Sequence, residues 1–225
     1  GEVIATAHIS TQKQWQDWAL DWHTGRNSIL WAVILGIGSG YIMFFIISGF
    51  IITFKRLRKT SQNKYKLSEA THIILVGSEN GSTKRYAASI FNQLRQQGHK
   101  AYSCSLNEWT QFDAATDLII LTATYGDGEA PHSAQNALGL IQQIAQVHTV
   151  NYSIVGFGSR QYPSFCQYAY DLSNVLQQHT WAQEVLPVYT VDDKSPSDFD
   201  LWLQAYNTAR QASLTLDPAF TKVPK

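Results

Sequence analysis

The stretch Thr71–Ala88, THIILVGSENGSTKRYAA, predicts a strand, a loop and a helix in immediate succession. Ile73–Val76 is wholly apolar, as expected of a strand buried on both faces of a parallel sheet. Gly77 ends this strand, small and hydroxyl-bearing residues follow it, and a helical pattern of apolar residues begins at Tyr86. Such a loop directs backbone N–H groups and the positive end of a helix dipole to one place. The stretch therefore predicts a phosphate site, with a capped helix that binds no ligand as the alternative.

The loop does not fit the two commonest nucleotide-binding motifs. A P-loop requires four residues between its two glycines and a Lys after the second glycine. Gly77 and Gly81 are one residue too close for this motif, and Ser82 occupies the position of the Lys. The glycine pattern of a Rossmann fingerprint is absent from this loop as well.

Strands and helices alternate through the rest of this region. Four further strands are expected, at Lys100–Ser103, Asp117–Thr122, Asn151–Phe157 and Glu184–Thr190. The first helix is expected to end near Gly98, and the later helices to cover His132–Val147, Pro163–Gln178 and Pro196–Gln211. This order predicts an α/β fold with a doubly wound, five-stranded parallel sheet. In such a sheet, ligands lie beyond the carboxyl ends of the strands.

Three loops follow strands at that edge of the predicted sheet, at residues 77–83, 122–129 and 157–166. The first offers phosphate donors. The second and third each place a tyrosine, Tyr125 or Tyr162, among glycines that allow the backbone to approach a ligand closely. A flat ring between aromatic side chains, with a phosphate at a helix start, describes flavin mononucleotide (FMN). Ordinary packing of either tyrosine in the core or on the surface is the alternative interpretation.

The loop sequences resemble the FMN-binding loops of the flavodoxin-like domain of diflavin reductases, such as NADPH-cytochrome reductase and the sulfite reductase flavoprotein. The motifs are SENGST at 78–83, TATYGDGEAP at 122–131 and GFGSRQYPSFC at 156–166, and the resemblance covers about residues 70–212. It implies that the FMN phosphate is held by Ser78, Glu79 through its backbone, Asn80, Gly81, Ser82 and Thr83. It implies that the flavin ring is held by Ala123, Thr124, Tyr125, Gly126, Phe157, Gly158, Ser159, Tyr162, Phe165 and Cys166, with the two tyrosines stacking on it.

An acidic residue near the flavin is also implied, and Asp192 or Asp193 matches its place. Two residues depart from the family pattern. Glu79 puts a carboxylate beside the expected phosphate, which is tolerable only if its side chain points outward. Ser159 stands where diflavin reductases commonly have Asn, which puts one contact to the ring edge in doubt.

Charge and cysteine content limit the classes of partner. Residues 1–66 carry eight Lys or Arg against three Asp or Glu, whereas residues 67–225 carry nine against fourteen. Residues 101–159 contain acids but no Lys or Arg, which argues against nucleic acid as a partner.

Cys104 and Cys166 match no metal-ligand spacing and are expected to be thiols in a reducing compartment. The chain begins at Gly1 with Met43 as its single Met, so we expect a piece of a longer protein.

The segment Ser28–Phe54 contains no charged residue and, as a helix, is long enough to cross a bilayer. A signal peptide would have a shorter apolar region, whereas this one runs into a basic cluster of Lys55, Arg56, Arg58, Lys59, Lys64 and Lys66. The positive-inside rule then places the following domain in the cytoplasm, beneath an inner membrane. Small residues between Gly36 and Gly49 favour packing against other transmembrane helices, although membrane helices also tolerate glycine in general.

Trp15, Trp18 and Trp22 predict a short amphipathic helix that lies on the outer face of this inner membrane. His23 lies just outside the span, either as a haem ligand paired with a histidine of another helix or as an ordinary interfacial residue. His-Thr-Gly-Arg before a glycine-rich span and a basic run resembles the last helix of the PepSY-associated transmembrane family, over roughly residues 10–60. That resemblance implies a multi-helix membrane unit in which haem is a candidate cofactor.

These patterns predict five segments: an extracytoplasmic amphipathic segment (1–27), a transmembrane helix (28–54), a basic cytoplasmic linker (55–70), an FMN-binding domain (71–212) and a C-terminal linker (213–225). The diflavin resemblance implies that a separate module with FAD and NADPH supplies electrons, which pass to haem or another redox acceptor such as a ferric chelate. No catalytic side chain is expected, because the flavin itself exchanges the electrons. The alternatives are a non-redox module of this fold on a membrane anchor, a flavodoxin-type NAD(P)H quinone reductase and a purely structural anchor.

Overall fold

The computed structural model describes residues 11–26, 28–58 and 63–221. The chain divides into two compact units, Gly1–Thr60 and Ser61–Lys225. Parts of the predicted segments lie outside the described residues: 1–10 and 27 of the amphipathic segment, 59–62 of the linker and 222–225 at the end. Within the basic cluster, Lys59 and the side chains of Lys55, Arg56 and Arg58 are outside the description.

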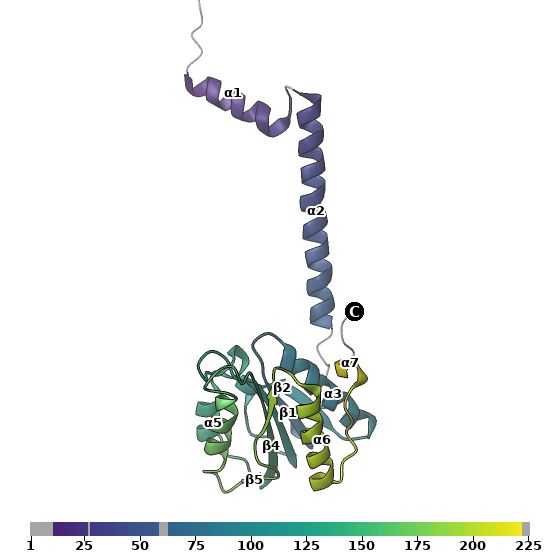
Figure 1. The fold of residues 1–225 in the computed structure, drawn as a ribbon, viewed down its shortest axis with the longest axis vertical. Coiled ribbons are helices and arrows are strands. Elements are labelled where there is room, and N and C mark those ends of the chain that lie inside the picture. The colour runs from purple at the N-terminus through teal and green to yellow at the C-terminus, as the bar shows by residue number, and fades with distance from the viewer. Residues whose placement is uncertain (1–10, 27, 59–62, 222–225) are drawn as a thin grey trace, which may run out of the picture. The chain divides into compact units, whose positions relative to one another are not determined.

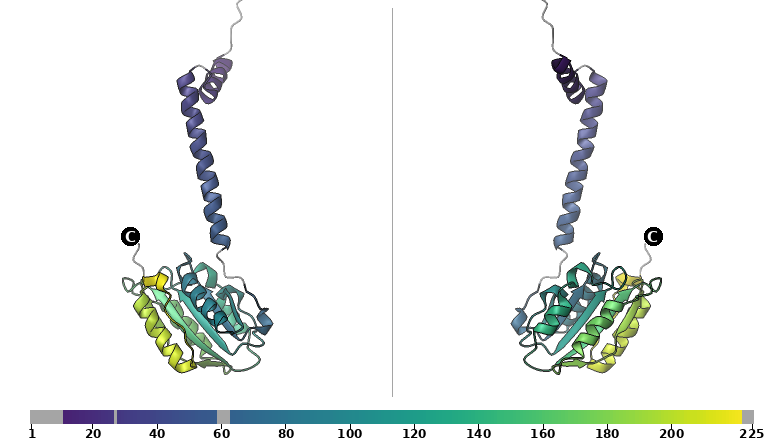
Figure 2. Two further views of the ribbon diagram at one scale, coloured as in Figure 1. Left: turned by 90° about the vertical axis from the view of Figure 1, so that its right-hand side faces the viewer. Right: turned by 90° about the vertical axis from the view of Figure 1, so that its left-hand side faces the viewer.

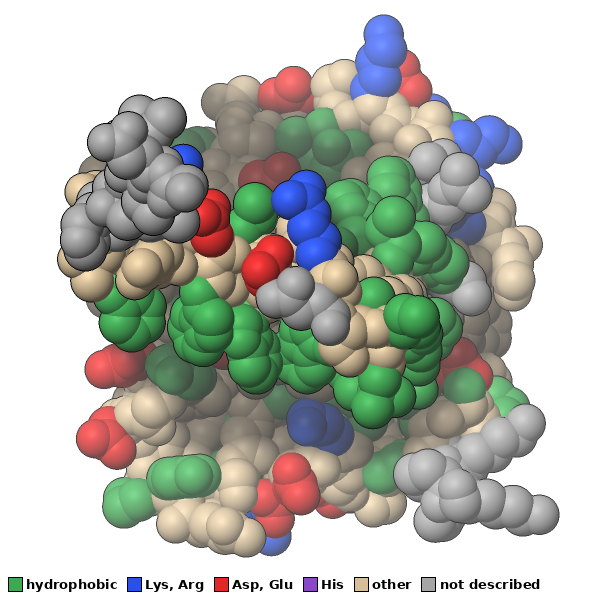
Figure 3. Space-filling model, turned by 90° about the horizontal axis from the view of Figure 1, so that it is seen from above, with side chains coloured by type: hydrophobic (Ala, Val, Ile, Leu, Met, Phe, Trp, Pro, Cys, Tyr) green, Lys and Arg blue, Asp and Glu red, His purple; other side chains and the backbone are tan. Residues whose placement is uncertain are grey.

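The first unit is a pair of helices, α1 (Thr11–Thr24) and α2 (Ile29–Arg58), joined by a tight turn (Figures 1 and 2). Gly25 makes this turn with φ +68°, and a Cβ at this position would lie 2.7 Å from Ala32 Cα. Glycine alone combines this positive φ with such a close approach. The indole Nε1 of Trp31 donates to the Trp22 carbonyl at 2.7 Å, which ties the start of α2 to the end of α1. Figure 3 shows hydrophobic side chains gathered over α1 and the start of α2.

Helix α2 has the length and composition of a membrane span over Ile29–Phe54. Its mean hydropathy reaches 2.2, and none of this apolar window is buried within the structure. The helix continues to Arg58, so the first residues of the predicted linker are helical.

The second unit is built on a parallel sheet with the order β2-β1-β3-β4-β5, in which β6 also pairs with β4 (Figure 1). The strands are β1 (His72–Gly77), β2 (Ala101–Ser105), β3 (Asp117–Ala123), β4 (Val150–Gly158), β5 (Ala182–Glu184) and β6 (Tyr189–Asp192). The helices are α3 (Ser82–Gln96), α4 (Ala137–Gln143), α5 (Gln167–Leu176), α6 (Pro196–Arg210) and α7 (Pro218–Thr221). Short 3₁₀ turns lie at η1 (Leu67–Glu69), η2 (Leu106–Glu108) and η3 (His132–Ala134). The predicted doubly wound α/β sheet is confirmed.

Successive residues of each central strand serve opposite faces of the sheet, which creates two cores. Ile73 and Leu75 of β1 join the core that contains side chains of α4 and α5. Ile74 and Val76 join the core that contains side chains of α3 and α6. All four side chains are at most 5% exposed, which explains why the strand reads as a continuous apolar run rather than an alternating one.

The fifth strand position holds two short strands in place of one continuous strand over Glu184–Thr190. Glu184 of β5 pairs with Tyr152 of β4, and Tyr189 of β6 pairs with Val155. Four residues therefore separate the paired residues on the edge segment, whereas only two separate their partners on β4. Pro187 lies among the extra residues, and proline cannot donate to a sheet ladder.

Two predicted helices are shorter than expected because side chains and backbone conformation override the local pattern. The helix expected over His132–Val147 divides into η3 and α4, and the Asn107 amide oxygen accepts from the Asn136 N–H at 2.9 Å between them. The helix expected from Pro163 begins at Gln167, because Cys166 adopts a left-handed φ of 55° and acts as the N-cap.

The segment after α6, which we expected to be a linker, packs against the domain over its described part. Leu214 is 2% exposed and exchanges two hydrogen bonds with the side chain of Asn207. Phe220 stacks on Tyr86 of α3, with ring centroids 4.2 Å apart. Residues 213–221 therefore belong to the folded unit.

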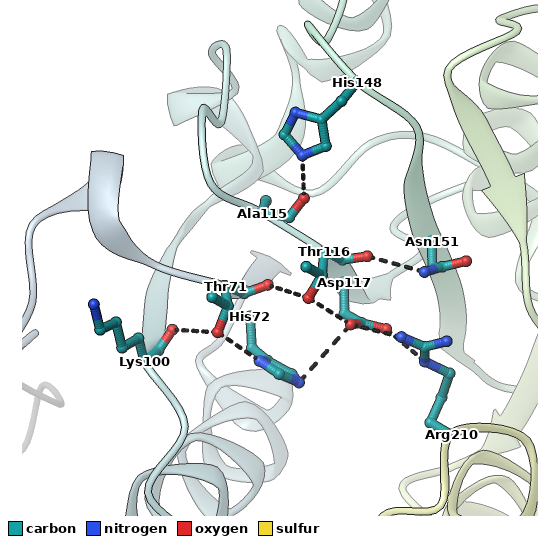
Figure 4. A network of polar contacts seen from close by, with 9 residues as sticks. All are labelled: Thr71, His72, Lys100, Ala115, Thr116, Asp117, His148, Asn151 and Arg210. Carbon is teal, nitrogen blue, oxygen red and sulfur yellow. Dashed lines mark hydrogen bonds and ion pairs between the residues drawn. The ribbon is translucent and has the colours of Figure 1, made fainter.

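A buried ion pair closes the end of the sheet opposite to the strand carboxyl ends (Figure 4). Asp117 is 4% exposed, and Arg210 grips both of its carboxylate oxygens, with Nε to Oδ1 at 2.7 Å and Nη2 to Oδ2 at 2.9 Å. Thr116 Oγ1 donates to the same carboxylate at 2.8 Å, and His72 Nε2 lies 3.9 Å from it. This network ties α6 to the first residues of β1 and β3.

Candidate cofactor site

The three predicted loops meet because their strands are neighbours in register. Gly77 at the end of β1 pairs with Thr122 of β3, and Ala123 pairs with Phe157 of β4. Since the strands are parallel and end level with one another, the loops that follow them share one edge of the sheet. The Thr124 N–H also donates to the Phe157 carbonyl at 2.9 Å, which joins the second loop to the third.

The first loop prepares an anion site at the start of α3. The Ser78 hydroxyl accepts from the Gly81 N–H at 2.9 Å and so shapes the loop from within. Gly81 is the N-cap of α3 at φ +80°, and no side chain caps the helix. The first-turn N–H groups, including those of Ser82 and Thr83, are therefore left to an external acceptor.

Thr83 adds a second sign of a missing partner. Its side chain is completely buried, and its Oγ1 makes no hydrogen bond within the described residues. A buried hydroxyl without a partner costs about 1–3 kcal/mol. A phosphate at this helix start would satisfy it, so the residues present fit the phosphate end of FMN.

The side chain of Glu79 is directed at η3. Its Oε2 accepts from the His132 N–H at 2.7 Å. The carboxylate therefore caps the start of η3. Asn80 beside it is exposed, and Ser82 is half-buried.

Ser133 is part of this site, although its sequence position inside an expected helix gives no signal of that role. Its hydroxyl accepts from the Ser78 N–H at 2.7 Å and lies 3.0 Å from the Ser78 carbonyl and 3.3 Å from the Val76 carbonyl. It thus holds the end of β1 and the start of the first loop. The signal appears only in three dimensions, where η3 folds back over that loop.

The second loop is a tight hairpin that presents Tyr125. The Tyr125 N–H donates to the Glu129 carbonyl at 2.9 Å, and the Glu129 N–H donates back at 2.7 Å. Gly126 at φ +52° and Gly128 at φ +113° make the reversal between them. Tyr125 is 53% exposed beside this turn, and Thr124 Oγ1 fixes the base of the loop by accepting from the Tyr168 N–H at 3.3 Å.

The third loop presents Tyr162, which is 58% exposed. Half-buried Phe165 lies at its end, with the Arg160 guanidinium 5.5 Å from the ring centroid. Gly158 packs closely on Phe165, because a Cβ at Gly158 would lie 3.2 Å from the Phe165 ring. Half-buried Ser159 shapes the loop, and its carbonyl accepts from the Tyr162 N–H at 3.1 Å.

Two predicted contacts of the third loop are turned into the core. Phe157 is 4% exposed, and its ring packs 5.0 Å from the Tyr86 ring, so its backbone is the part that borders the site. Cys166 is completely buried, and burial raises the pKa of its thiol to about 12. The thiol is therefore neutral at physiological pH and contributes bulk rather than charge.

The structure separates the roles of the two candidate acids. Asp192 Oδ1 accepts from the Arg160 N–H at 2.9 Å, so its carboxylate supports the third loop directly. Asp193 contributes through its backbone, since its N–H donates to the Gly158 carbonyl at 2.8 Å while its φ is 41°. Of the two, Asp192 is thus the acid whose side chain forms a hydrogen bond with the third loop.

Comparison with known proteins decides the family. The flavodoxin family model, described as "Flavodoxin", matches residues 74–202, which is more than half of the chain. The chain belongs to the flavodoxin family. The chain is 31% identical over 101 residues to the inducible nitric oxide synthase of Mus musculus, covering 44% of this chain and 9% of that protein. It is 28% identical over 126 residues to the sulfite reductase [NADPH] flavoprotein alpha-component of Shewanella oneidensis, covering 54% of this chain and 21% of that protein.

Solved flavodoxins have the same fold as the second unit. A cysteine-to-serine mutant of flavodoxin from Pseudomonas aeruginosa matches with a TM-score of 0.54 at 22% identity, over 63% of this chain and 99% of that one. Oxidised flavodoxin 1 from Bacillus cereus matches with a TM-score of 0.53 at 17% identity, over 64% of this chain and all of that one. The second unit therefore has the fold of a whole flavodoxin, while this chain spans only 9% and 21% of the length of the two curated relatives named above.

The predicted haem ligand of the first unit stands apart from other candidate ligands. His23 is exposed at the end of α1, and its Nδ1 lies 2.9 Å from the Ala19 carbonyl of the same helix. Among the described residues, no group of three His, Cys, Asp or Glu side chains is placed to hold a metal ion. Haem binding by His23 therefore remains a prediction from the sequence.

Proposed function

We propose that this chain is the FMN-binding electron-transfer part of a membrane-anchored flavoprotein reductase. The observation that carries the proposal is a combination of features at one edge of the sheet. The start of α3 has no side-chain cap, and the buried Thr83 hydroxyl there has no hydrogen-bond partner among the described residues. Two loops at the same edge expose Tyr125 and Tyr162. When bound there, FMN supplies the redox chemistry. The protein binds its phosphate at α3, orients its ring between the second and third loops, and keeps the Cys166 thiol neutral.

Charge around the site supports an electron-transfer role. Asp127, Glu129 and Asp193 are exposed around the loops, and Asp192 is half-buried beside them. Negative charge at this edge disfavours added negative charge on a bound ring, and it attracts a partner with a basic face. Both effects suit a relay between two partners.

A reductase partner is supported by the relatives. They include the flavoprotein component of an NADPH sulfite reductase and nitric oxide synthases, and all are much longer than the domain that they share with this chain. We infer that a module with FAD and NADPH delivers electrons to this domain. The electrons then pass to haem held by further transmembrane helices or to another acceptor at the membrane, such as a ferric chelate.

Membrane anchoring by α2 is the second part of the proposal. It rests on the 26-residue apolar window Ile29–Phe54. Because basic residues follow this window, we infer from the positive-inside rule that the flavodoxin domain lies in the cytoplasm. Flotation of the full chain with phospholipid vesicles through a sucrose gradient tests the anchoring. Extraction by alkaline carbonate would contradict it.

The redox part is tested on the purified full chain. We expect the protein, mixed with excess FMN and passed through a desalting column, to retain about one FMN per chain, measured by its flavin absorbance. A colourless, folded protein would overturn the proposal and favour a non-redox module of the same fold. Oxidation of NADPH by quinone without any partner protein would favour a quinone reductase instead.

A further inference from the structure

A pocket of about 320 Å³ lies between α1 and α2 in the first unit. It is lined by Trp18, Asp21, Trp22, Ser28 and Trp31, and we refer to these five residues as the indole pocket. Three tryptophans and one aspartate therefore border an open space large enough for a small organic group. None of these residues takes part in the proposed flavin site.

Hydrogen bonds at the turn link the two helices that border the pocket. At the turn, the Gly25 N–H donates a hydrogen bond to the Asp21 carbonyl at 2.9 Å. The Trp31 Nε1–H donates to the Trp22 carbonyl at 2.7 Å. The Trp22 and Trp31 rings meet edge to face at 4.9 Å, and the Trp18 and Trp22 ring centroids lie 5.7 Å apart. Trp18 and Trp22 nevertheless stay 55% and 50% exposed, so much of their ring surface is available.

Indole faces beside a carboxylate favour a cation. The faces of tryptophan rings attract ammonium groups, and aromatic cages are a recurrent way to bind them. Asp21 takes part in another interaction within the structure, but a carboxylate has about four lone-pair sites and accepts more than one partner. The lining of the pocket therefore matches an organic ammonium better than an anion or an alkyl chain.

The position of the pocket identifies the source of that ammonium. Ser28 and Trp31 lie at the N-terminal boundary of the apolar window Ile29–Phe54, which is head-group depth if α2 spans a bilayer. Exposed Arg26 lies in the same turn and supplies a positive charge for a phosphate. Resting on the proposed membrane anchoring, we propose that the indole pocket binds the ammonium of a zwitterionic phospholipid head group, with Arg26 near its phosphate.

The test is native mass spectrometry of the full chain released from detergent micelles that contain phosphatidylethanolamine or phosphatidylglycerol with the same acyl chains. We expect the fraction of chains retaining phosphatidylethanolamine to exceed the fraction retaining phosphatidylglycerol about tenfold. Asp21→Asn keeps the shape of the pocket but removes its charge, and Trp18→Leu removes an aromatic face but keeps an apolar side chain. Both should reduce this ratio to about one.

Trp15→Leu is the matched control, because Trp15 lies on the same helix and is 66% exposed but does not line the pocket. It should leave the tenfold preference intact. The proposal would be overturned if the unmodified chain retained the two lipids equally, or if Trp15→Leu lowered the preference as much as Asp21→Asn and Trp18→Leu do. A dimer that retained neither lipid would overturn it as well. Vesicle flotation separates the two hypotheses: a chain that floats without lipid preference contradicts only the pocket, whereas a chain that does not float contradicts the anchoring as well.

Discussion

Thr83 combines complete burial with a hydroxyl that has no partner among the described residues, and this combination makes it the most informative residue of the proposed flavin site. We expect Thr83→Val, which keeps the shape, to weaken FMN binding roughly 10- to 100-fold, because a hydrogen bond to a charged phosphate contributes about 1.5–3 kcal/mol. The free energy of unfolding of the FMN-free protein should stay equal or rise, since an unpaired buried hydroxyl is removed. FMN titration by fluorescence and urea unfolding measure the two effects.

The matched control is Thr208→Val on α6, whose hydroxyl binds the Gln204 carbonyl of the same helix at 2.9 Å. This change should leave FMN affinity unaltered. If Thr83→Val destabilises the FMN-free protein by more than about 1 kcal/mol, its hydroxyl has a partner within the fold, and the argument for a phosphate contact is lost.

Tyr162 is the residue we expect to stack on the outer face of the flavin ring. Its replacement by Ala should weaken FMN affinity roughly threefold to tenfold, because an aromatic stacking contact contributes about 0.5–1.5 kcal/mol. Tyr170→Ala, at a 43% exposed tyrosine of α5, is the control for a general loss of aromatic surface. An unchanged affinity in Tyr162→Ala, measured by the same titration, would show that the third loop is wrongly assigned.

At the scale of elements, the start of α3 depends on the left-handed conformation of Gly81. Gly81→Ala should lower the free energy of unfolding by about 1–2 kcal/mol, the cost of placing a Cβ residue in that conformation. Gly139→Ala, inside α4 where a Cβ would meet nothing within 4 Å, should raise it by about 0.5–1 kcal/mol. Urea unfolding of both variants makes the comparison, and equal shifts would contradict the role of the N-cap conformation.

The same elements show what local sequence can and cannot predict. The strand, loop and helix of Thr71–Ala88 were predictable because each is indicated by residues close together in the sequence: an apolar run, a glycine and a helical pattern. The division of the fifth strand and the late start of α5 were not, because they depend on a register with β4 and on the left-handed conformation of Cys166. The contacts of Ser133 and of the Glu79 carboxylate depend on η3 folding over the first loop, a contact across more than fifty residues.

At the scale of the whole domain, the network that closes the far end of the sheet makes stability depend on pH. Burial is the largest cause that lowers the pKa of His72, with His99 and Arg210 acting in the same direction and Asp117 opposing them. The unfolded chain therefore binds a proton at His72 more readily than the folded one. The resulting stability is complete above the unfolded pKa of about 6.5 and is lost as pH falls below it toward the lower folded pKa.

We accordingly expect His72→Gln to flatten the fall in the free energy of unfolding as the pH decreases below about 6.5, the unfolded pKa of histidine. Urea unfolding at several pH values in this range provides the measurement, with His132→Gln as the control at an exposed ring. A fall of the same slope in His72→Gln and in the unmodified protein would show that other groups cause it.

The size of the described part of the chain supports a last prediction, that the chain does not accept electrons from NADPH by itself. A flavodoxin matches over 99% of its own length and covers 63% of this chain, and the remaining described residues are mainly α1 and α2. Within the described residues there is thus room for one nucleotide-binding α/β domain but not for a second. We expect NADPH alone to leave the absorbance of the FMN-loaded chain unchanged under anaerobic conditions, while dithionite bleaches it. Bleaching by NADPH at a rate proportional to chain concentration would mean that this sheet edge accepts electrons directly from the nicotinamide, and no reductase module would then be required.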